Sequence, residues 1–247
     1  MEENHTKAKE KTTQKTLISA IILAGVLIAL AILLKDSKPP IREGYSGGMP
    51  VEKNYLNNNG GIPVTALAPV TAQDMALGNP LAKVTLIVYA DFQCPFCAKL
   101  FQESEKTIID TYVRNGDVQF VYRDFAFLGP ESVRAAEAAR CAGDQGKFWE
   151  YHDYLFNNHN GENEGAFADP KLKAFAKTLG LNSVAFDSCF DTNKYEGAVI
   201  AAKNEGDSAG VSGTPKGFIL RDGQIVSTID GAEPFTTVKA KIDKALQ

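Results

Sequence analysis

The chain has 247 residues, enough for one sizeable domain with appendages or for two small domains. A formal net charge of −4 provides no basic surface of the kind that attracts nucleic acid, so no nucleic-acid partner is expected. Four cysteines are too few for a small domain held together by disulfides alone, but an even number suits two pairs.

The first predicted element is a membrane anchor over residues 17–34, after a cytoplasmic tail of residues 1–16. The anchor reads LISAIILAGVLIALAILL and carries no charge. At about 1.5 Å per residue it spans roughly 27 Å, enough to cross the hydrocarbon core of a bilayer. A cleaved signal peptide is the alternative. Its apolar stretch would be shorter, and no small-x-small cleavage site follows Leu34, so we expect an uncleaved anchor.

Basic residues on the two sides of the anchor orient it only weakly. Four lysines precede it and three basic residues follow it, which slightly favours a cytoplasmic N-terminus. A second stable disulfide would in addition require an oxidising compartment. We therefore expect a single-pass membrane protein whose C-terminal domain is extracytoplasmic.

Residues 35–78 are predicted to form a flexible linker, because glycine, proline and asparagine crowd this stretch and no helix or strand period persists in it. A folded domain is expected over 79–247. Its first strand is 84–90 (VTLIVYA), a continuous apolar and β-branched run typical of a strand covered on both faces. A long helix over 95–114 and a second strand over 118–125 follow, and this order implies parallel pairing of the two strands.

The stretch 131–208 is helical in character and is predicted to be an insertion. Its helices are expected over 131–142, 147–156, 170–179 and 184–205, the last with a break around Cys189. Two strands over 218–221 and 224–229, joined by the hairpin turn Asp222-Gly223, and a terminal helix over 235–246 complete the domain. This order of elements resembles an α/β, thioredoxin-like fold with a helical insertion.

The central motif is Cys94-Pro95-Phe96-Cys97, which follows the predicted buried strand and opens the predicted long helix. Pro95 suits the first helical position because proline has no N–H to leave unpaired. The Cys94 sulfur is then near the unsatisfied N–H groups of the first turn, whose partial positive charge stabilises a thiolate. Cys94 is the predicted nucleophile, and Cys97, one turn along, the predicted resolving thiol.

Two other interpretations of the motif are half of a structural zinc site and a purely structural disulfide. A zinc site needs further ligands, and the rest of the chain offers Cys141, Cys189 and three histidines without a second close pair. A structural disulfide that closes so short a loop gains little from loop-closure entropy. We therefore prefer redox chemistry and predict no metal site.

Six blocks of sequence together resemble one known family. They are Leu77-Gly78-Asn79-Pro80, Val84-Thr85, Asp91-Phe92-Gln93-Cys94-Pro95-Phe96-Cys97, Ala138-Ala139-Arg140-Cys141-Ala142, Gly146-Lys147-Phe148-Trp149 and Gly213-Thr214-Pro215. In this order they resemble the DsbA-type thiol–disulfide oxidoreductases, in the branch of membrane-anchored or secreted DsbA-like proteins. The resemblance covers roughly residues 71–247.

The resemblance implies roles for four residues outside the central motif. Pro215 would be a cis-proline facing the active disulfide, and Thr214 would offer backbone groups to bound polypeptide. The residues by themselves indicate only a turn at this place. The resemblance also implies that Cys141 and Cys189 pair with each other as a structural disulfide, with two buried free thiols as the alternative.

Three features depart from the family pattern. Related proteins usually carry an acidic residue six positions before the first cysteine, where this chain has Val88. They usually continue after the cis-proline with a small polar residue and an aromatic one, where this chain has Lys216-Gly217. The middle pair of the motif is Pro95-Phe96, and the side chain of Phe96 cannot donate a hydrogen bond to the Cys94 thiolate, as a histidine there could. These departures concern rate, redox poise or substrate choice, and leave the thiol chemistry in place.

We therefore expect a thiol–disulfide oxidoreductase that acts, without an organic cofactor, on cysteine-containing exported polypeptides as their oxidant. Its reoxidation implies a membrane redox partner, quinone-linked by family analogy. One alternative is a reductase or isomerase fed by a membrane electron donor. Another is a non-enzymatic thioredoxin-like module that binds polypeptide or metal. Trp149 is expected in the core of the insertion, and His152 and His159 at the surface or as helix caps.

Overall fold

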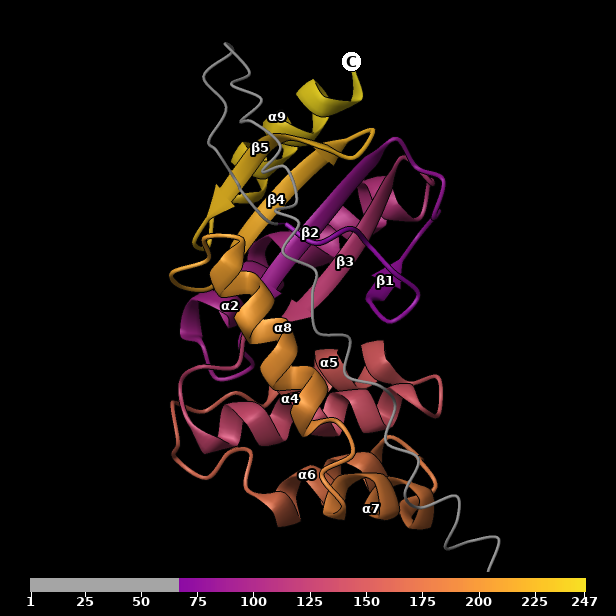
Figure 1. The fold of residues 1–247 in the computed structure, drawn as a ribbon, viewed down its shortest axis with the longest axis vertical. Helices are drawn as coiled ribbons and strands as arrows, with labels where there is room; N and C mark the ends of the chain where they lie inside the picture. The colour runs from indigo at the N-terminus through magenta and orange to yellow at the C-terminus, as the bar shows by residue number, and fades with distance from the viewer. Residues whose placement is uncertain (1–66) are drawn as a thin grey trace, which may run out of the picture. The chain divides into compact units, whose positions relative to one another are not determined.

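The computed structural model describes residues 67–247 (Figure 1). The predicted tail 1–16, the anchor 17–34 and the linker up to residue 66 lie outside the described residues and stay predictions. Within residues 67–247, no helix combines the length and the hydrophobicity that crossing a bilayer requires.

The described residues build a five-stranded mixed sheet with the strand order β1-β3-β2-β4-β5. The strands are β1 (Met75–Leu77), β2 (Val84–Ala90), β3 (Val118–Asp124), β4 (Lys216–Arg221) and β5 (Gln224–Asp230). β2 pairs in parallel with β3 and antiparallel with β4, while β1 and β5 pair antiparallel at the two edges. The predicted parallel pairing on either side of the long helix is confirmed.

The central strand β2 has a core on each of its faces. The larger cluster of buried side chains takes its alternate residues Val84, Leu86, Val88 and Ala90. The smaller cluster takes Ile87 and Tyr89. Successive side chains of a strand point to opposite faces, so a strand covered on both sides is apolar without interruption. The larger cluster also contains Cys94 and Cys97, which places the motif at its edge.

One helical segment runs from Pro95 to Val113 along the larger cluster. It comprises α2 (Pro95–Leu100), η1 (Phe101–Glu105), α3 (Lys106–Ile108) and η2 (Ile109–Val113), of which the two η parts are π-helical. The predicted helix 95–114 is therefore present, with wider turns interrupting its α-helical hydrogen bonding. α9 (Phe235–Leu246) lies beside it and buries Val238 and Ile242 in the same cluster.

The predicted insertion lies between β3 and β4. Its helices are α4 (Pro130–Gly143), α5 (Phe148–Asn157), α6 (Asp169–Thr178), α7 (Ser183–Asp191) and α8 (Glu196–Ser208). Figure 1 shows α4 to α7 gathered beyond one end of the sheet, with α8 running from them back toward the strands. The expected break in 184–205 is real and lies at residues 192–195, where Asn193 has a φ of 51°.

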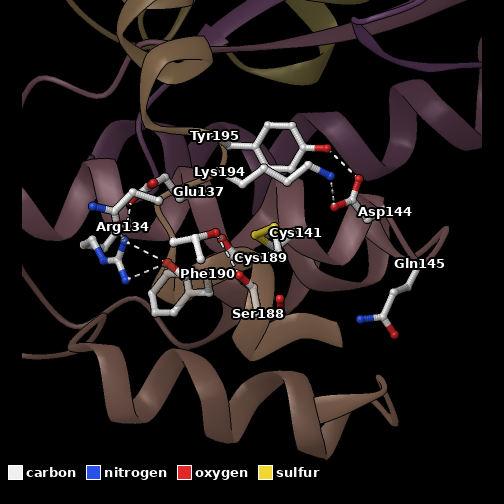
Figure 2. The surroundings of a disulfide bond; sticks show 12 residues. Arg134, Glu137, Cys141, Asp144, Gln145, Ser188, Cys189, Phe190, Lys194 and Tyr195 are labelled. Carbon is white, nitrogen blue, oxygen red and sulfur yellow. Dashed lines mark hydrogen bonds and ion pairs between the residues drawn. A yellow bond between two sulfur atoms is a disulfide. The ribbon is translucent and has the colours of Figure 1, made fainter. Parts of the chain in front are cut away.

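A disulfide between Cys141 of α4 and Cys189 of α7 ties the insertion together (Figure 2). The two Cα atoms are 5.8 Å apart and both residues are buried, so the structure shows the implied pair rather than two free thiols. Lys194 and Tyr195 donate to the Asp144 carboxylate next to it, at 2.7 and 2.5 Å. Closing a loop across 48 positions contributes about 4 kcal/mol in the chain-entropy model.

The end of the predicted linker is ordered, which corrects its boundary. Met75–Leu77 forms β1 on β3, although the linker was expected to extend to residue 78. The Arg123 guanidinium of β3 holds the preceding residues, because it donates to the Pro69 carbonyl at 3.0 Å and to the Asp74 carboxylate at 2.8 Å. The short run Met-Ala-Leu carries no strand signal of its own. Its hydrogen bonds to β3 make it a strand.

Candidate active site

The two cysteines of the motif lie where the turn after β2 enters the long helical segment. Cys94 precedes α2 with an extended backbone, and its carbonyl accepts the Ala98 N–H at 3.0 Å. Pro95 stands in the first helical turn, as predicted. Both cysteines are buried free thiols, whereas Phe96 between them is 61 % exposed. The motif therefore presents an aromatic ring to the surface and keeps both sulfur atoms mostly covered.

Cys94 is the more acidic of the two thiols. A hydrogen bond from the Cys97 thiol has the largest effect on it, and the nearby Thr214 side chain and the backbone N–H groups of Cys97 and Phe96 act in the same direction. Burial opposes these contributions but does not outweigh them. Together they lower the pKa of Cys94 to about 6. Most of this thiol is therefore a thiolate, the reactive form, at neutral pH.

Cys97 has the opposite character. Burial raises the pKa of its thiol well above the ordinary value, and the neighbouring Cys94 raises it further. A hydrogen bond from the Asp91 backbone lowers it, but by less. The ionised Cys94 thus suits the predicted role of nucleophile, and the enclosed, protonated Cys97 suits that of resolving thiol.

Thr214 and Pro215 lie opposite Cys94, on the loop that leads into β4. Their peptide bond is cis, as the family resemblance implied. The Cys94 sulfur lies 3.3 Å from the Thr214 carbonyl oxygen, to which it donates in its protonated form. The pairing of β2 with β4 makes this contact possible across 120 positions of sequence. The structure thus brings together all four predicted catalytic residues, Cys94, Cys97, Thr214 and Pro215.

Asp91 organises the turn between β2 and Cys94, a role that the sequence analysis missed. Its buried carboxylate accepts hydrogen bonds from the Gln93 N–H, the Ser132 hydroxyl, and the N–H groups of Phe127 and Leu128, at 2.7–3.1 Å. These donors occupy the carboxylate, so Asp91 fixes the geometry of the turn. The available signal was an acidic residue placed directly after a buried strand and before the motif.

Two of the departures from the family pattern are neighbours. Val88 of β2 is the register partner of Gly217 of β4. Val88 is buried in the cluster that contains Cys94, so the position that usually carries an acid is apolar. A Cβ on Gly217 would lie 2.9 Å from the Cβ of Ile229, whose side chain occupies the space that a larger residue would need. The two changes together keep this part of the core close-packed and uncharged.

His152 is buried inside α5, and the expectation that it lies at the surface or caps a helix is wrong. Six aromatic rings surround it with centroids 4.9–6.1 Å away, those of Phe92, Phe101, Tyr122, Phe148, Trp149 and Phe156. Its Nε2 lies 3.6 Å from a carboxylate oxygen of Glu105, whose pKa is raised by burial. His152 shares the inner face of α5 with Phe148 and Phe156, one turn away on either side, so it turns toward the core. Trp149 packs against the core, as expected.

Comparison with known proteins shows which family the chain belongs to. The thioredoxin family model matches residues 70–244, most of the chain. The chain is 35 % identical over 206 residues to the "Na(+)/H(+) antiporter NhaA 1" of Salinispora arenicola, covering 82 % of this chain and 29 % of the antiporter. It is 27 % identical over 193 residues to the "Putative protein-disulfide oxidoreductase" of Rickettsia felis, covering 75 % of this chain and 64 % of that protein. The chain thus spans less than two thirds of either relative.

Two solved structures share the fold. α-DsbA1 of Wolbachia pipientis is 22 % identical with a TM-score of 0.65, and the match covers 73 % of this chain and 94 % of that one. Oxidised BdbD of Bacillus subtilis is 21 % identical with a TM-score of 0.66, over 73 % and 97 % of the two chains. These likenesses confirm the predicted thioredoxin-like fold with its helical insertion. The chain belongs to the thioredoxin family, and DsbA proteins are its structural neighbours there.

Proposed function

We propose that the chain is a thiol–disulfide oxidoreductase that oxidises cysteine-containing polypeptides. The observation that carries the proposal is the asymmetry of the motif, in which the pKa of Cys94 is lowered to about 6 and that of Cys97 is raised. A thiolate that forms below neutral pH stabilises the reduced pair relative to the disulfide, which makes the disulfide a stronger oxidant. It also makes Cys94 a good leaving group.

The exchange needs only the two cysteines and the client thiols. A client thiolate attacks the Cys94 sulfur, the bond between Cys94 and Cys97 breaks, and Cys97 leaves as a thiolate and takes up a proton. A second client thiolate attacks the client sulfur of this mixed disulfide and expels Cys94 as a thiolate. Two client thiols thereby lose two electrons and form a disulfide, and the motif ends reduced. No organic cofactor takes part in these steps.

Polypeptide clients fit the surroundings of Cys94. Phe96 is well exposed beside it, and Phe127, whose backbone N–H donates to the Asp91 carboxylate, is 43 % exposed. Exposed aromatic rings provide apolar contact to a bound chain, and Thr214 at the cis-proline offers backbone groups to it. The name of the Rickettsia felis relative also specifies protein disulfides. Regeneration of the motif then requires a membrane redox partner that accepts two electrons, and a quinone-linked partner is proposed by family analogy.

The proposed place of action is outside the cytoplasm, with residues 17–34 as the anchor. The uncharged apolar run supports this topology, and so does the disulfide between Cys141 and Cys189, because structural disulfides are rare in reducing compartments. Protease added to intact cells should digest the domain after residue 67 and leave an N-terminal fragment in the membrane. Full protection of the domain, with digestion only after lysis, would contradict the topology.

The reduction potential of the Cys94–Cys97 pair tests the direction of exchange. We expect a value at or above roughly −150 mV, because the lowered pKa of Cys94 stabilises the reduced state. Equilibration of the full chain with glutathione buffers, followed by mass spectrometry of the alkylated thiols, measures it. A potential near roughly −250 mV would indicate a reductase instead. Absence of any reversible couple would indicate a module that only binds polypeptide or metal.

A further inference from the structure

The loop between α5 and α6, residues 158–168, reaches from the insertion to the turn that precedes Cys94. The ring Nε2 of His159 lies 2.5 Å from the Gln93 carbonyl oxygen. The Asn163 backbone N–H donates to the Gln93 side-chain oxygen, also at 2.5 Å. Two residues of one loop therefore hold the residue immediately before the nucleophile, across more than sixty positions of sequence.

The chemistry of the His159 contact is unambiguous. A carbonyl oxygen can only accept, so the Nε2 atom of His159 must carry the hydrogen and donate it. The ring keeps this hydrogen both in the matching neutral tautomer and when it is doubly protonated. Among the described residues, no second donor bonds the Gln93 carbonyl. The orientation of the peptide unit that joins Gln93 to Cys94 thus depends on the imidazole.

The remaining polar groups of Gln93 have partners other than His159. Its backbone N–H donates to the Asp91 carboxylate at 2.8 Å, and its side-chain amide donates to the Ser132 hydroxyl at 2.8 Å. The residue is completely buried. Its carbonyl is therefore the one polar group of Gln93 whose partner is a half-buried, titratable ring of the insertion loop.

We propose that His159 is a positioning residue for Cys94, which keeps the Gln93–Cys94 peptide in the orientation that directs the Cys94 sulfur to the first helical N–H groups. The inference rests on the proposed function and identifies a residue that favours ionisation of its nucleophile, Cys94. Without the imidazole, the negative end of the Gln93 carbonyl dipole would be unpaired close to the thiolate and would disfavour it. The side chain of Phe96, inside the motif, has no donor that could replace it.

The loop itself does not depend on His159 for its position. The Glu131 carboxylate accepts the N–H groups of Gly165 and Phe167, both at 2.8 Å. The Asn163 side-chain amide donates to the Leu128 carbonyl, also at 2.8 Å. These bonds anchor the loop at the start of α4. Removal of the imidazole should therefore change the peptide before Cys94 while the loop and the domain stay folded.

The test is the ionisation of Cys94 in the reduced full chain, followed by the ultraviolet absorbance of its thiolate as pH rises. His159→Phe keeps the bulk of the ring and removes the donor, and His159→Ala is a second variant without a donor. His159→Gln keeps an N–H donor at similar reach. Asn160→Ala changes an exposed neighbour in the same loop whose side chain makes no hydrogen bond among the described residues.

We expect the donor-free variants to raise the pKa of Cys94 by about 0.5–1 unit, a roughly three- to tenfold loss of thiolate below that pKa. The Gln and Asn160→Ala variants should titrate like the wild type, and all should melt cooperatively. An unchanged pKa in both donor-free variants would overturn the inference, and so would equal shifts in all four variants. If Cys94 titrated as an ordinary thiol in the wild type, the proposed function would fall together with it.

Discussion

Replacement of Cys97 by alanine should trap client polypeptides on Cys94 as mixed disulfides. The Cys94 thiolate can still attack a client disulfide and release one client thiolate, but no second thiol stands beside it to break the new bond. In the native chain the neighbouring Cys97 acts at a high effective concentration, so its loss should slow client release by roughly 10³-fold or more. Incubation with a disulfide-bearing peptide, followed by non-reducing electrophoresis, measures the trapped fraction.

The matched variant is Cys94→Ala, which should trap far less client. It leaves Cys97, a buried thiol whose pKa is raised and which is therefore protonated at neutral pH. A chain with both cysteines replaced reports any trapping through the remaining disulfide. Equal trapping by the two single variants would contradict the assigned roles, because it would show that enclosure does not limit the reactivity of Cys97.

The reduction potential should change its pH dependence near pH 6. Below this pH, reduction of the disulfide takes up two electrons and two protons, and the potential falls by about 59 mV per pH unit. Above it Cys94 stays ionised and only Cys97 takes up a proton, so the slope should halve to about 30 mV per unit. Titration of the couple between about pH 5 and 8 measures the two slopes.

The lowered pKa of Cys94 also determines how the stability of the folded, reduced chain depends on pH. The pKa of Cys94 is about 6 in the folded reduced chain and that of an unfolded thiol is about 8.5, so the folded thiolate adds stability fully above pH 8.5. This contribution is lost as the pH falls through 6. Cys97 lowers the stability of the folded chain at high pH, because its thiol ionises there in the unfolded chain but stays protonated where it is buried.

A glutathione couple is the control for the pH dependence of the Cys94–Cys97 reduction potential, because its thiols titrate well above the measured pH range. Its potential should fall along one straight line. A straight line of the same slope for the Cys94–Cys97 couple would show that Cys94 ionises as an ordinary thiol. The argument for an oxidant would then lose its physical basis.

The local pattern of the sequence determined most of the elements and the motif. The run 84–90 has the bounds of β2 because an apolar, β-branched stretch is stable as a strand only when both faces are covered. Proline after Cys94 and the apolar period beyond it required a helix that begins at the motif. These signals are short in range, so one sequence contains them. The roles of Thr214 and Pro215 and the pairing of Cys141 with Cys189 came from the family resemblance.

Contacts between distant segments decided the rest. β1 exists because β3 offers it hydrogen bonds, and His152 is buried because six aromatic rings close around one face of α5. Val88 and Gly217 meet only when β2 and β4 pair. The hydrogen bond from His159 to the Gln93 carbonyl depends on how the insertion loop folds back on the sheet. Local propensity cannot encode such contacts, because their free energy arises only when two segments have already been brought together by the packed core.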